Sequence, residues 1–264
     1  MLDKLGEPYR YLKSFKNKKY ASQAREFMKR LVPKAPKHKG FVRLGRDYDG
    51  GYVMLDEFSK NDVAYSIGIC DDTSWDEDIS KRDIDVFMYD HTIAPLKVGG
   101  RLHFFKTGVC GTNTKQKDLL TLEEMLIKDN NISKDIILKI DVEGAEWDVF
   151  STISEDVLKK FSQIAIELHW ICNRIKNKEQ YNQMIIALDN LNKTHQVIHV
   201  HGNNYSRCEL IGGVPVCQAL EVTYIRKGKY EFLNQKSEEA HRLDLPCYPK
   251  LPDYTLCVEA FRTY

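Results

Sequence analysis

The sequence predicts an α/β fold in which helices cover both faces of a mostly parallel sheet. Three observations support this prediction. Short apolar segments alternate with segments whose apolar residues recur at helical spacing. Several of the apolar segments end in a glycine or an acidic residue, and the 264-residue length suits one large α/β domain or two small ones. Apolar strands that alternate with helices are typical of a parallel sheet buried on both faces.

Seven segments are predicted to be strands. They are residues 62–69, 85–90, 100–109, 135–141, 163–171, 195–202 and 219–227. Each is a short, mainly apolar run next to residues that favour turns. The last two are close in sequence, which suggests a hairpin and one antiparallel strand in a doubly wound sheet.

Four segments are predicted to be helices. They are residues 8–32, 121–130, 146–161 and 178–194. The second begins with Thr121 and carries Glu124 three positions later, which is the pattern of a capping box. In the third, Glu146 lies in the first turn, where a carboxylate complements the helix dipole, so we interpret it as mainly structural.

The domain prediction divides the chain into a basic helical N-terminal extension, residues 1–39, and a main domain, residues 40–264, with an irregular C-terminal tail. The Pro- and Lys-rich segment 32–40 is the predicted linker. Residues 1–39 hold twelve basic and three acidic residues, a net charge of +9, whereas the whole chain has +1. Such a segment suits an anionic partner, although a solvated helix face explains it equally well.

Composition excludes several classes of protein. The sequence has no 18-residue apolar run, so no integral membrane segment is expected, and the first residues lack the apolar core of a secretory signal. The seven cysteines form no CxxC pair, which favours reduced thiols and a cytoplasmic location. The basic charge lies in one terminal segment, so no nucleic-acid partner is expected.

The first two predicted strands end in residues that suit a nucleoside. Gly68 closes the first, but Ile69 and Cys70 follow it, so the GxGxxG motif typical of NAD and FAD sites is absent. Asp90 closes the second strand, 22 positions after Gly68. An acid about twenty residues after such a glycine is where α/β folds bind ribose hydroxyls. The alternative is a structural turn or cap acid.

The later strands end in polar side chains that should converge on one edge of the sheet. Asp141 ends the fourth strand and Glu143 follows it. Glu167 and His169 end the fifth strand; His199, His201, Asn203 and Asn204 end the sixth. Such a set suits proton abstraction, orientation of a polar substrate, or a hard cation. Each histidine taken alone is as well explained by a structural role.

Seven segments together resemble FkbM-type and related class I S-adenosylmethionine-dependent methyltransferases. They are "VRLGRDYDGGYVM" (42–54), "YSIGICDDTSWD" (65–76), "VFMYDHT" (86–92), "TLEEML" (121–126), "ILKIDVEGAEWDVF" (137–150), "IELHW" (166–170) and "LEVTYIRK" (220–227). The resemblance implies a Rossmann-like fold with a seven-stranded sheet in the order 3-2-1-4-5-7-6. Cys70 departs from it, because many of these enzymes have a second glycine there.

The resemblance also implies roles for residues at the sheet edge. S-adenosylmethionine would contact Gly68, Asp71, Asp72, Asp90, His91, Gly108, Val109 and Asp141, with Arg43 and Tyr52 from the segment before the first strand. Asp141, Glu143, His169 and His201 are the predicted catalytic residues, and the two histidines are the predicted bases. Glu167, Asn203 and Asn204 are predicted to bind the acceptor. A divalent cation such as Mg²⁺ is not demanded by the spacing; its candidate ligands are Asp141, Glu167 and His201.

The expected activity is transfer of a methyl group to a small polar acceptor. The resemblance favours a hydroxyl of a sugar, or of a phosphorylated or nucleotide-linked precursor, in a bacterial surface polysaccharide or natural product. One alternative is N-methylation of a similar precursor. The other is a non-catalytic, methyltransferase-like partner subunit. The sequence does not predict the oligomeric state.

Overall fold

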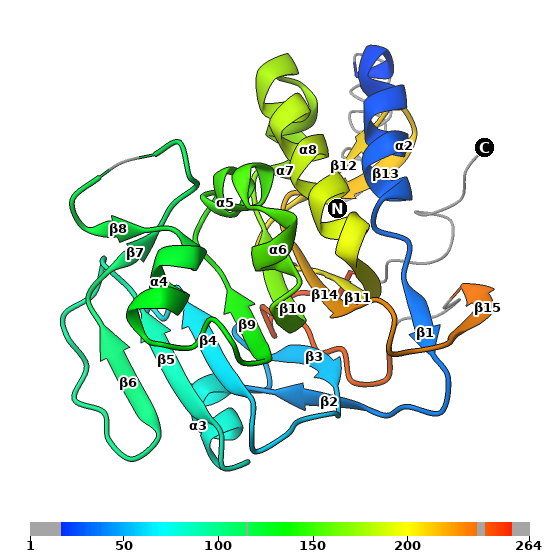
Figure 1. The fold of residues 1–264 in the computed structure, drawn as a ribbon. Helices are drawn as coiled ribbons and strands as arrows, with labels where there is room; N and C mark the ends of the chain where they lie inside the picture. The colour runs from blue at the N-terminus through cyan, green and yellow to red at the C-terminus, as the bar shows by residue number, and fades with distance from the viewer. Residues whose placement is uncertain (1–16, 115, 237–240, 255–264) are drawn as a thin grey trace.

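The fold centres on a seven-stranded sheet (Figure 1). The computed structural model describes residues 17–114, 116–236 and 241–254. The sheet strands are β4 (Val63–Ile67), β5 (Asp85–Tyr89), β6 (Leu102–Phe105), β9 (Ile136–Ile140), β10 (Phe161–Leu168), β11 (His195–Gly202) and β14 (Leu220–Arg226). Their spatial order β6-β5-β4-β9-β10-β14-β11 is 3-2-1-4-5-7-6 in chain order, which confirms the predicted fold.

The pairing of these strands is parallel except at β14. That strand runs antiparallel to both of its neighbours, β10 and β11. The predicted hairpin between the last two strands is wrong in detail, because another hairpin, β12 (Cys208–Ile211) with β13 (Val214–Cys217), lies between them. The central strands β4 and β9 are buried at every position, as expected for strands covered on both faces.

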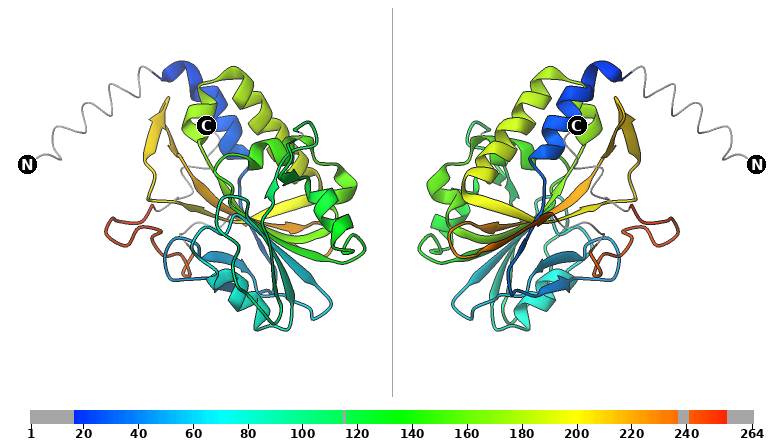
Figure 2. Two further views of the ribbon diagram at one scale, coloured as in Figure 1. Left: turned by 90° about the vertical axis from the view of Figure 1, so that its left-hand side faces the viewer. Right: turned by 90° about the vertical axis from the view of Figure 1, so that its right-hand side faces the viewer.

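Helices cover the two faces unequally. They are η2 (Lys18–Tyr20), α2 (Ala21–Lys29), α3 (Ser74–Ser80), α4 (Leu122–Lys128), α5 (Glu146–Thr152), α6 (Glu155–Leu158), α7 (Ile171–Ile175) and α8 (Lys178–Thr194). Figure 2 shows the sheet edge-on, with α2, α5 and α8 above it and α3 with the hairpin β2 (Phe41–Leu44) and β3 (Tyr52–Leu55) below it. Each face therefore has its own buried apolar cluster.

Local chemistry explains where several helices begin. Thr121 and Glu124 form the predicted capping box at the start of α4. The predicted helix over residues 146–161 is instead two short helices, because Ile153 is extended and Ser154 caps α6 by accepting from the Val157 N–H. The sequence pattern did not reveal this break, since apolar residues continue at helical spacing across it.

The described part of the N-terminal extension lies against the main body. Ala24, Phe27, Met28 and Leu31 are buried in the upper apolar cluster. Part of the predicted linker is strand β1 (Lys34–Pro36), which pairs with β15 (Phe232–Lys236) near the other end of the chain. The division into an extension and a main domain stays a prediction, and residues 1–16 lie outside the described residues.

The predicted third strand is interrupted. Residues 102–105 form β6, whereas β7 (Gly108–Val109) leaves the sheet and pairs with β8 (Leu119–Leu120). This turn brings Gly108 and Val109 over the carboxyl edge of the sheet.

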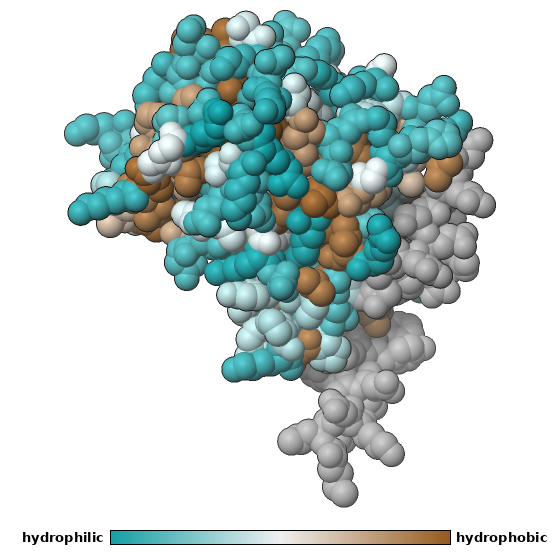
Figure 3. Space-filling model, turned by 90° about the horizontal axis from the view of Figure 1, so that it is seen from below, coloured by the Kyte–Doolittle hydropathy of each residue, from teal (hydrophilic) through white to brown (hydrophobic). Residues whose placement is uncertain are grey.

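The surface seen from below is mainly hydrophilic, with apolar residues scattered between polar ones (Figure 3). In residues 17–114, 116–236 and 241–254, no helix has both the length and the apolarity that crossing a membrane requires.

One buried amide makes several of the hydrogen bonds that hold the C-terminal segment 241–254 against the sheet. The Asn204 side chain donates to the carbonyls of Tyr248, Leu251 and Pro252 at 3.1–3.2 Å and accepts from the Tyr248 N–H at 2.6 Å. Asn204 is therefore a clamp on this segment, whose backbone pairs with the sheet only at the isolated bridge between Tyr254 and Gly202 in the described residues.

We predict that Asn204→Ala lowers the free energy of unfolding by about 1–3 kcal/mol, because it removes the four hydrogen bonds that this buried amide makes to the C-terminal segment. Urea denaturation measures this loss, and limited proteolysis should then cut the 241–254 segment first. The exposed Asn61→Ala variant is the matched control and should unfold like the wild type. Equal stability of both variants would contradict the clamp.

Candidate functional site

Two adjoining cavities open at the carboxyl edge of the sheet. The donor-side cavity, of about 310 Å³, lies over the ends of β4, β5 and β9. The acceptor-side cavity, of about 290 Å³, lies over the ends of β9 and β10. Asp49, Asp141 and Glu143 line both. Ligands of α/β sheets bind at this edge, so the two cavities form the candidate site.

The turn after β4 owes its shape to two left-handed residues. Gly68 has φ +80°, and a Cβ there would lie 1.7 Å from the Asp141 carbonyl oxygen, so only glycine fits between the ends of β4 and β9. Cys70 has φ +52°, a conformation that glycine adopts more easily. Cys70 thus adopts a backbone conformation typical of glycine, the residue that the resemblance implies at this position.

Asp90 holds this turn. One carboxylate oxygen accepts from the N–H groups of Ile69 and Cys70 at 2.9 and 3.0 Å. The other accepts from the Thr92 N–H and hydroxyl at 2.7 and 2.6 Å. Burial alone would raise the pKa of Asp90, but these hydrogen bonds lower it to about 2, so the group is ionised near neutral pH. The predicted ribose contact stays a prediction, and a ribose would share oxygens that the turn already uses.

The remaining predicted donor-side residues surround the same cavity. Asp71, Asp72, His91, Gly108 and Val109 all line it. A Cβ on Gly108 would lie 2.3 Å from the His91 ring, so this glycine allows the ring to pack beside it. Asp72 is paired with Arg46, 3.2 Å away, which also lines the cavity.

Arg43 and Tyr52 lie behind the cavities. Arg43 donates to the carbonyls of Arg46 and Tyr48 and so supports the turn before β3. Tyr52 is buried, and its hydroxyl donates to an Asp141 oxygen at 3.4 Å. Neither side chain lines the donor-side or the acceptor-side cavity. Arg43 contacts Arg46, and Tyr52 contacts Asp141, and both of these residues line a cavity.

Asp141 stands where the two cavities meet. Its N–H donates to the Ile67 carbonyl at 2.9 Å, which fixes it at the junction of β4 and β9. Lys139, two residues earlier on β9, reaches the donor-side cavity and donates to the Gly68 carbonyl at 2.6 Å. The sequence analysis missed Lys139, because a lysine inside an apolar strand gave no spacing signal.

The loop after Asp141 brings an aromatic ring to the acceptor-side cavity. Glu143 and Gly144 have φ +52° and +107°, and this double left-handed turn lets the Glu143 carbonyl accept from the Trp170 indole at 3.1 Å. A Cβ on Gly144 would lie 2.9 Å from the Trp170 ring. Trp170 is 47% exposed and Tyr205 59%, and both line the cavity.

Glu146 is fully buried beneath this loop. Its two oxygens accept from the N–H groups of Gly144 and His169, both at 2.7 Å. One of them also lies 3.4 Å from His169 Nδ1. The role predicted for Glu146, mainly structural, agrees with these contacts, although they are specific hydrogen bonds at the edge of the site.

His169 is surrounded by carboxylates. Its Nε2 lies 3.6 Å from Asp141 and from Glu167, and 3.7 Å from Glu143. Burial alone would lower the pKa of His169, but its contact with Glu146 and the charges of Glu167 and Asp141 raise it to about 10. Burial and the Asp141 charge also raise the pKa of Glu167 well above its usual range. A raised pKa does not favour the role of base predicted for His169, and that role stays a prediction.

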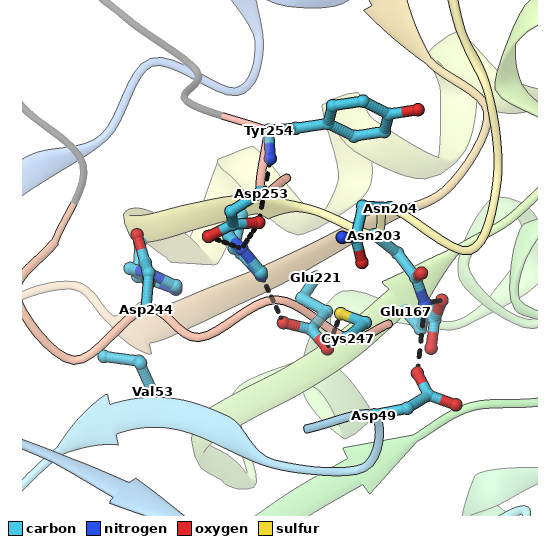
Figure 4. Close-up of polar contacts among 12 residues, drawn as sticks. Asp49, Val53, Glu167, Asn203, Asn204, Glu221, Asp244, Cys247, Asp253 and Tyr254 are labelled. Atoms are coloured by element: carbon cyan, nitrogen blue, oxygen red, sulfur yellow. Dashed lines mark hydrogen bonds and ion pairs between the residues drawn. The ribbon is translucent and has the colours of Figure 1, made fainter. Parts of the chain in front are cut away.

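Asn203 links two acids at the back of the acceptor-side cavity (Figure 4). Its amide donates to Glu167 at 2.7 Å and to Asp49 at 3.1 Å. Burial raises the pKa of Asp49 to about 6, with further contributions from the charges of Glu221 and Asp141. Asp49 lines both cavities and so belongs to the site, although the sequence analysis did not name it as a site residue.

His201 and Asn204 lie outside both cavities, and this corrects two predicted roles. His201 is 2% exposed, and its ring forms hydrogen bonds with Glu221 at 2.8 Å and with Asp253 at 2.9 Å, so it anchors the C-terminal segment. These carboxylates outweigh burial and raise its pKa to about 10, which also rules it out as the base near neutral pH. Asn204 is the clamp described above. The sequence analysis gave Asp141, Glu167 and His201 as candidate ligands of a cation. In the structure, the histidine next to Asp141 and Glu167 is His169.

The fold and the site together define a class of protein. The strand order 3-2-1-4-5-7-6 and a cavity over Gly68 and Asp90 are those of Rossmann-like methyltransferases. A family model for the methyltransferase FkbM domain matches residues 53–208, more than half of the chain. The chain therefore belongs to this family and is a methyltransferase. A comparison with curated proteins found no significant match.

We predict that Gly144→Ala displaces the Trp170 ring, because alanine at φ +107° is strained and its Cβ would press on that ring. The strain should cost about 1–3 kcal/mol of unfolding free energy. Acrylamide quenching of fluorescence reports on Trp170, since Trp75 and Trp147 are buried. Gly99→Ala, which meets no atom within 4 Å, is the control; unchanged quenching and stability in Gly144→Ala would disprove the contact.

Proposed function

We propose that the protein is an S-adenosylmethionine-dependent O-methyltransferase whose acceptor is a small polyhydroxylated molecule such as a sugar unit. The observation that carries the proposal is that Asp49, Asp141 and Glu143 line both cavities. A donor group and an acceptor group would meet beside these three carboxylates. A surface-polysaccharide or natural-product precursor remains the proposed source of the acceptor, and a cytoplasmic location remains part of the proposal.

The donor-side cavity fits S-adenosylmethionine in size and chemistry. A volume of about 310 Å³ is at the lower end of the range of small-molecule sites. Asp90 and the Gly68 turn would hold the nucleoside, His91, Gly108 and Val109 its base, and Asp141 the cationic methionine end. When bound, this cofactor supplies a methyl group activated on a sulfonium.

The acceptor-side cavity fits a sugar better than a flat or strongly apolar molecule. Trp170 and Tyr205 offer exposed rings beside polar groups of Glu167, Asn203 and Gln218. Aromatic faces pack against the C–H faces of sugar rings while the polar groups bind hydroxyls. The carboxylates repel anions, so a phosphate or nucleotide on the acceptor would lie away from them.

Asp49 is the proposed proton acceptor. It lines both cavities, and its pKa of about 6 leaves it ionised near neutral pH while keeping it basic. The acceptor O–H bond breaks and its proton passes to Asp49. The oxygen electron pair would then form a bond to the methyl carbon that the bound cofactor would supply, and the electron pair of the broken carbon–sulfur bond would stay on the sulfur.

A second candidate is N-methylation, which the acidity of the cavity favours. An amine would bind there as an ammonium and would have to lose a proton to Asp49 before it could react. The proposed non-catalytic alternative predicts that no acceptor is methylated.

We expect S-adenosylhomocysteine to bind the wild-type protein more tightly than about 1 mM in a calorimetric titration. A methylation assay with sugars, polyols, nucleotide sugars and matched amino sugars should then show transfer to hydroxyls. Transfer to amines alone would favour the second candidate. Binding without any transfer would favour a partner subunit, and failure to bind would overturn the proposal.

We predict that Asp49→Asn lowers kcat by about 10²–10⁴-fold and changes S-adenosylhomocysteine affinity less than tenfold, because it removes the base and leaves the donor side intact. Single-turnover kinetics and calorimetry measure the two effects. Asp47→Asn, exposed in the same turn, is the matched control. Wild-type kcat in Asp49→Asn would exclude Asp49 as the proton acceptor.

A further inference from the structure

Three side chains of different chemistry converge where the two cavities meet. Asp141 follows β9, Glu167 lies near the end of β10 and His169 follows that strand. One ligand atom from each lies within 4.8 Å of the other two. The His169 side chain is 9% exposed, and its Nε2 lies 3.6 Å from an oxygen of Asp141 and 3.6 Å from one of Glu167. These distances are too long for hydrogen bonds.

The separations match those of atoms that share a metal ion. Two ligand atoms that each lie about 2.1 Å from one ion are about 3.0–3.6 Å apart for angles of about 90–120°. The two distances from His169 Nε2 fall at the upper end of that interval. A small inward movement of the carboxylates would complete the coordination.

The surroundings of the three side chains match the outer layer of a metal site. Glu146 lies 3.4 Å behind His169 Nδ1, which has no hydrogen bond within the described part of the chain. Asn203 donates to Glu167 at 2.7 Å, and the Tyr52 hydroxyl donates to Asp141 at 3.4 Å. Metal-binding histidines commonly present their second nitrogen to a carboxylate, and metal-binding carboxylates are held by such donors.

We propose that Asp141, Glu167 and His169 bind a divalent transition-metal ion, of which Mn²⁺ is the best representative. Two carboxylates with one imidazole suit Mn²⁺ better than Mg²⁺, which prefers oxygen ligands alone. The ion offsets the repulsion among the carboxylates around His169. This site rests on the proposed function for its role: its open positions bind two neighbouring oxygens of the acceptor and make the hydroxyl easier to deprotonate.

The second cluster of metal-ligand residues in the described ranges serves as an internal control. His201, Glu221 and Cys247 are all buried, and their ligand atoms also lie within 4.8 Å. Both His201 nitrogens, however, already make hydrogen bonds to carboxylates, at 2.8 and 2.9 Å. This cluster is complete without an ion.

The test is a titration of metal-free protein with Mn²⁺ alone. Electron paramagnetic resonance measures the concentration of free Mn²⁺ at each step of the titration. We expect one site with a dissociation constant below about 1 mM, weakened at least tenfold in Glu167→Gln and in His169→Gln. The isosteric Glu221→Gln should bind like the wild type. Thermal unfolding confirms that each variant is folded, and Mn²⁺ should raise the unfolding temperature of the wild type and of Glu221→Gln but not of the other two.

Two results would overturn the metal site: no Mn²⁺ binding by the wild type, or binding that is lost in Glu221→Gln but kept in Glu167→Gln and His169→Gln. S-adenosylhomocysteine is titrated separately in the presence of a chelator. If it binds while Mn²⁺ does not, the metal site alone fails. If Mn²⁺ binds but S-adenosylhomocysteine does not, the metal site stands and the proposed function fails.

Discussion

The candidate site depends on one buried carboxylate, that of Glu146. Its oxygens hold the N–H groups of Gly144 and His169, so the loop after β9 and the end of β10 are joined at one point. A buried carboxylate is costly unless it receives hydrogen bonds, so this contact favours one arrangement of the two segments. The positions of Asp141, Trp170 and the His169 ring follow from that arrangement. Glu146, which the sequence analysis placed in the first turn of a helix, thus fixes the two segments that line the acceptor-side cavity.

The sequence predicted the sheet and its carboxyl edge because apolar strands carry a strong local signal. Gly68, Asp90, Asp141 and Glu167 were found by asking what each strand ends in, and all four lie at the cavities or line them. The same rule failed for His201, although it lies on a sheet strand. Its partner Asp253 lies 52 positions further along the chain, and no local pattern reports such a pairing.

The sequence also failed to predict the backbone conformation of Cys70 and the charges that surround His169. Cys70 has a left-handed backbone conformation, which a cysteine in a sequence does not indicate. Its φ of +52° explains how a cysteine can stand where the resemblance implies a glycine. The electrostatics of His169 depend on four carboxylates from separate positions, Asp141, Glu143, Glu146 and Glu167. The sequence shows none of these carboxylates as neighbours of His169, so it could not predict the environment of this side chain.

The family match covers most, but not all, of the residues that line the two cavities. It covers residues 53–208 and so includes Gly68, Asp90 and Asp141 on the donor side. Asp49 and Gln218, which line the acceptor-side cavity, lie outside that range. The Asp49 N–H donates to the Cys247 carbonyl at 3.1 Å, so the clamped C-terminal segment holds the wall of this cavity from behind. The part of the chain that matches the family thus supplies most of the lining of both cavities, while segments before and after it add Asp49 and Gln218 to the acceptor side.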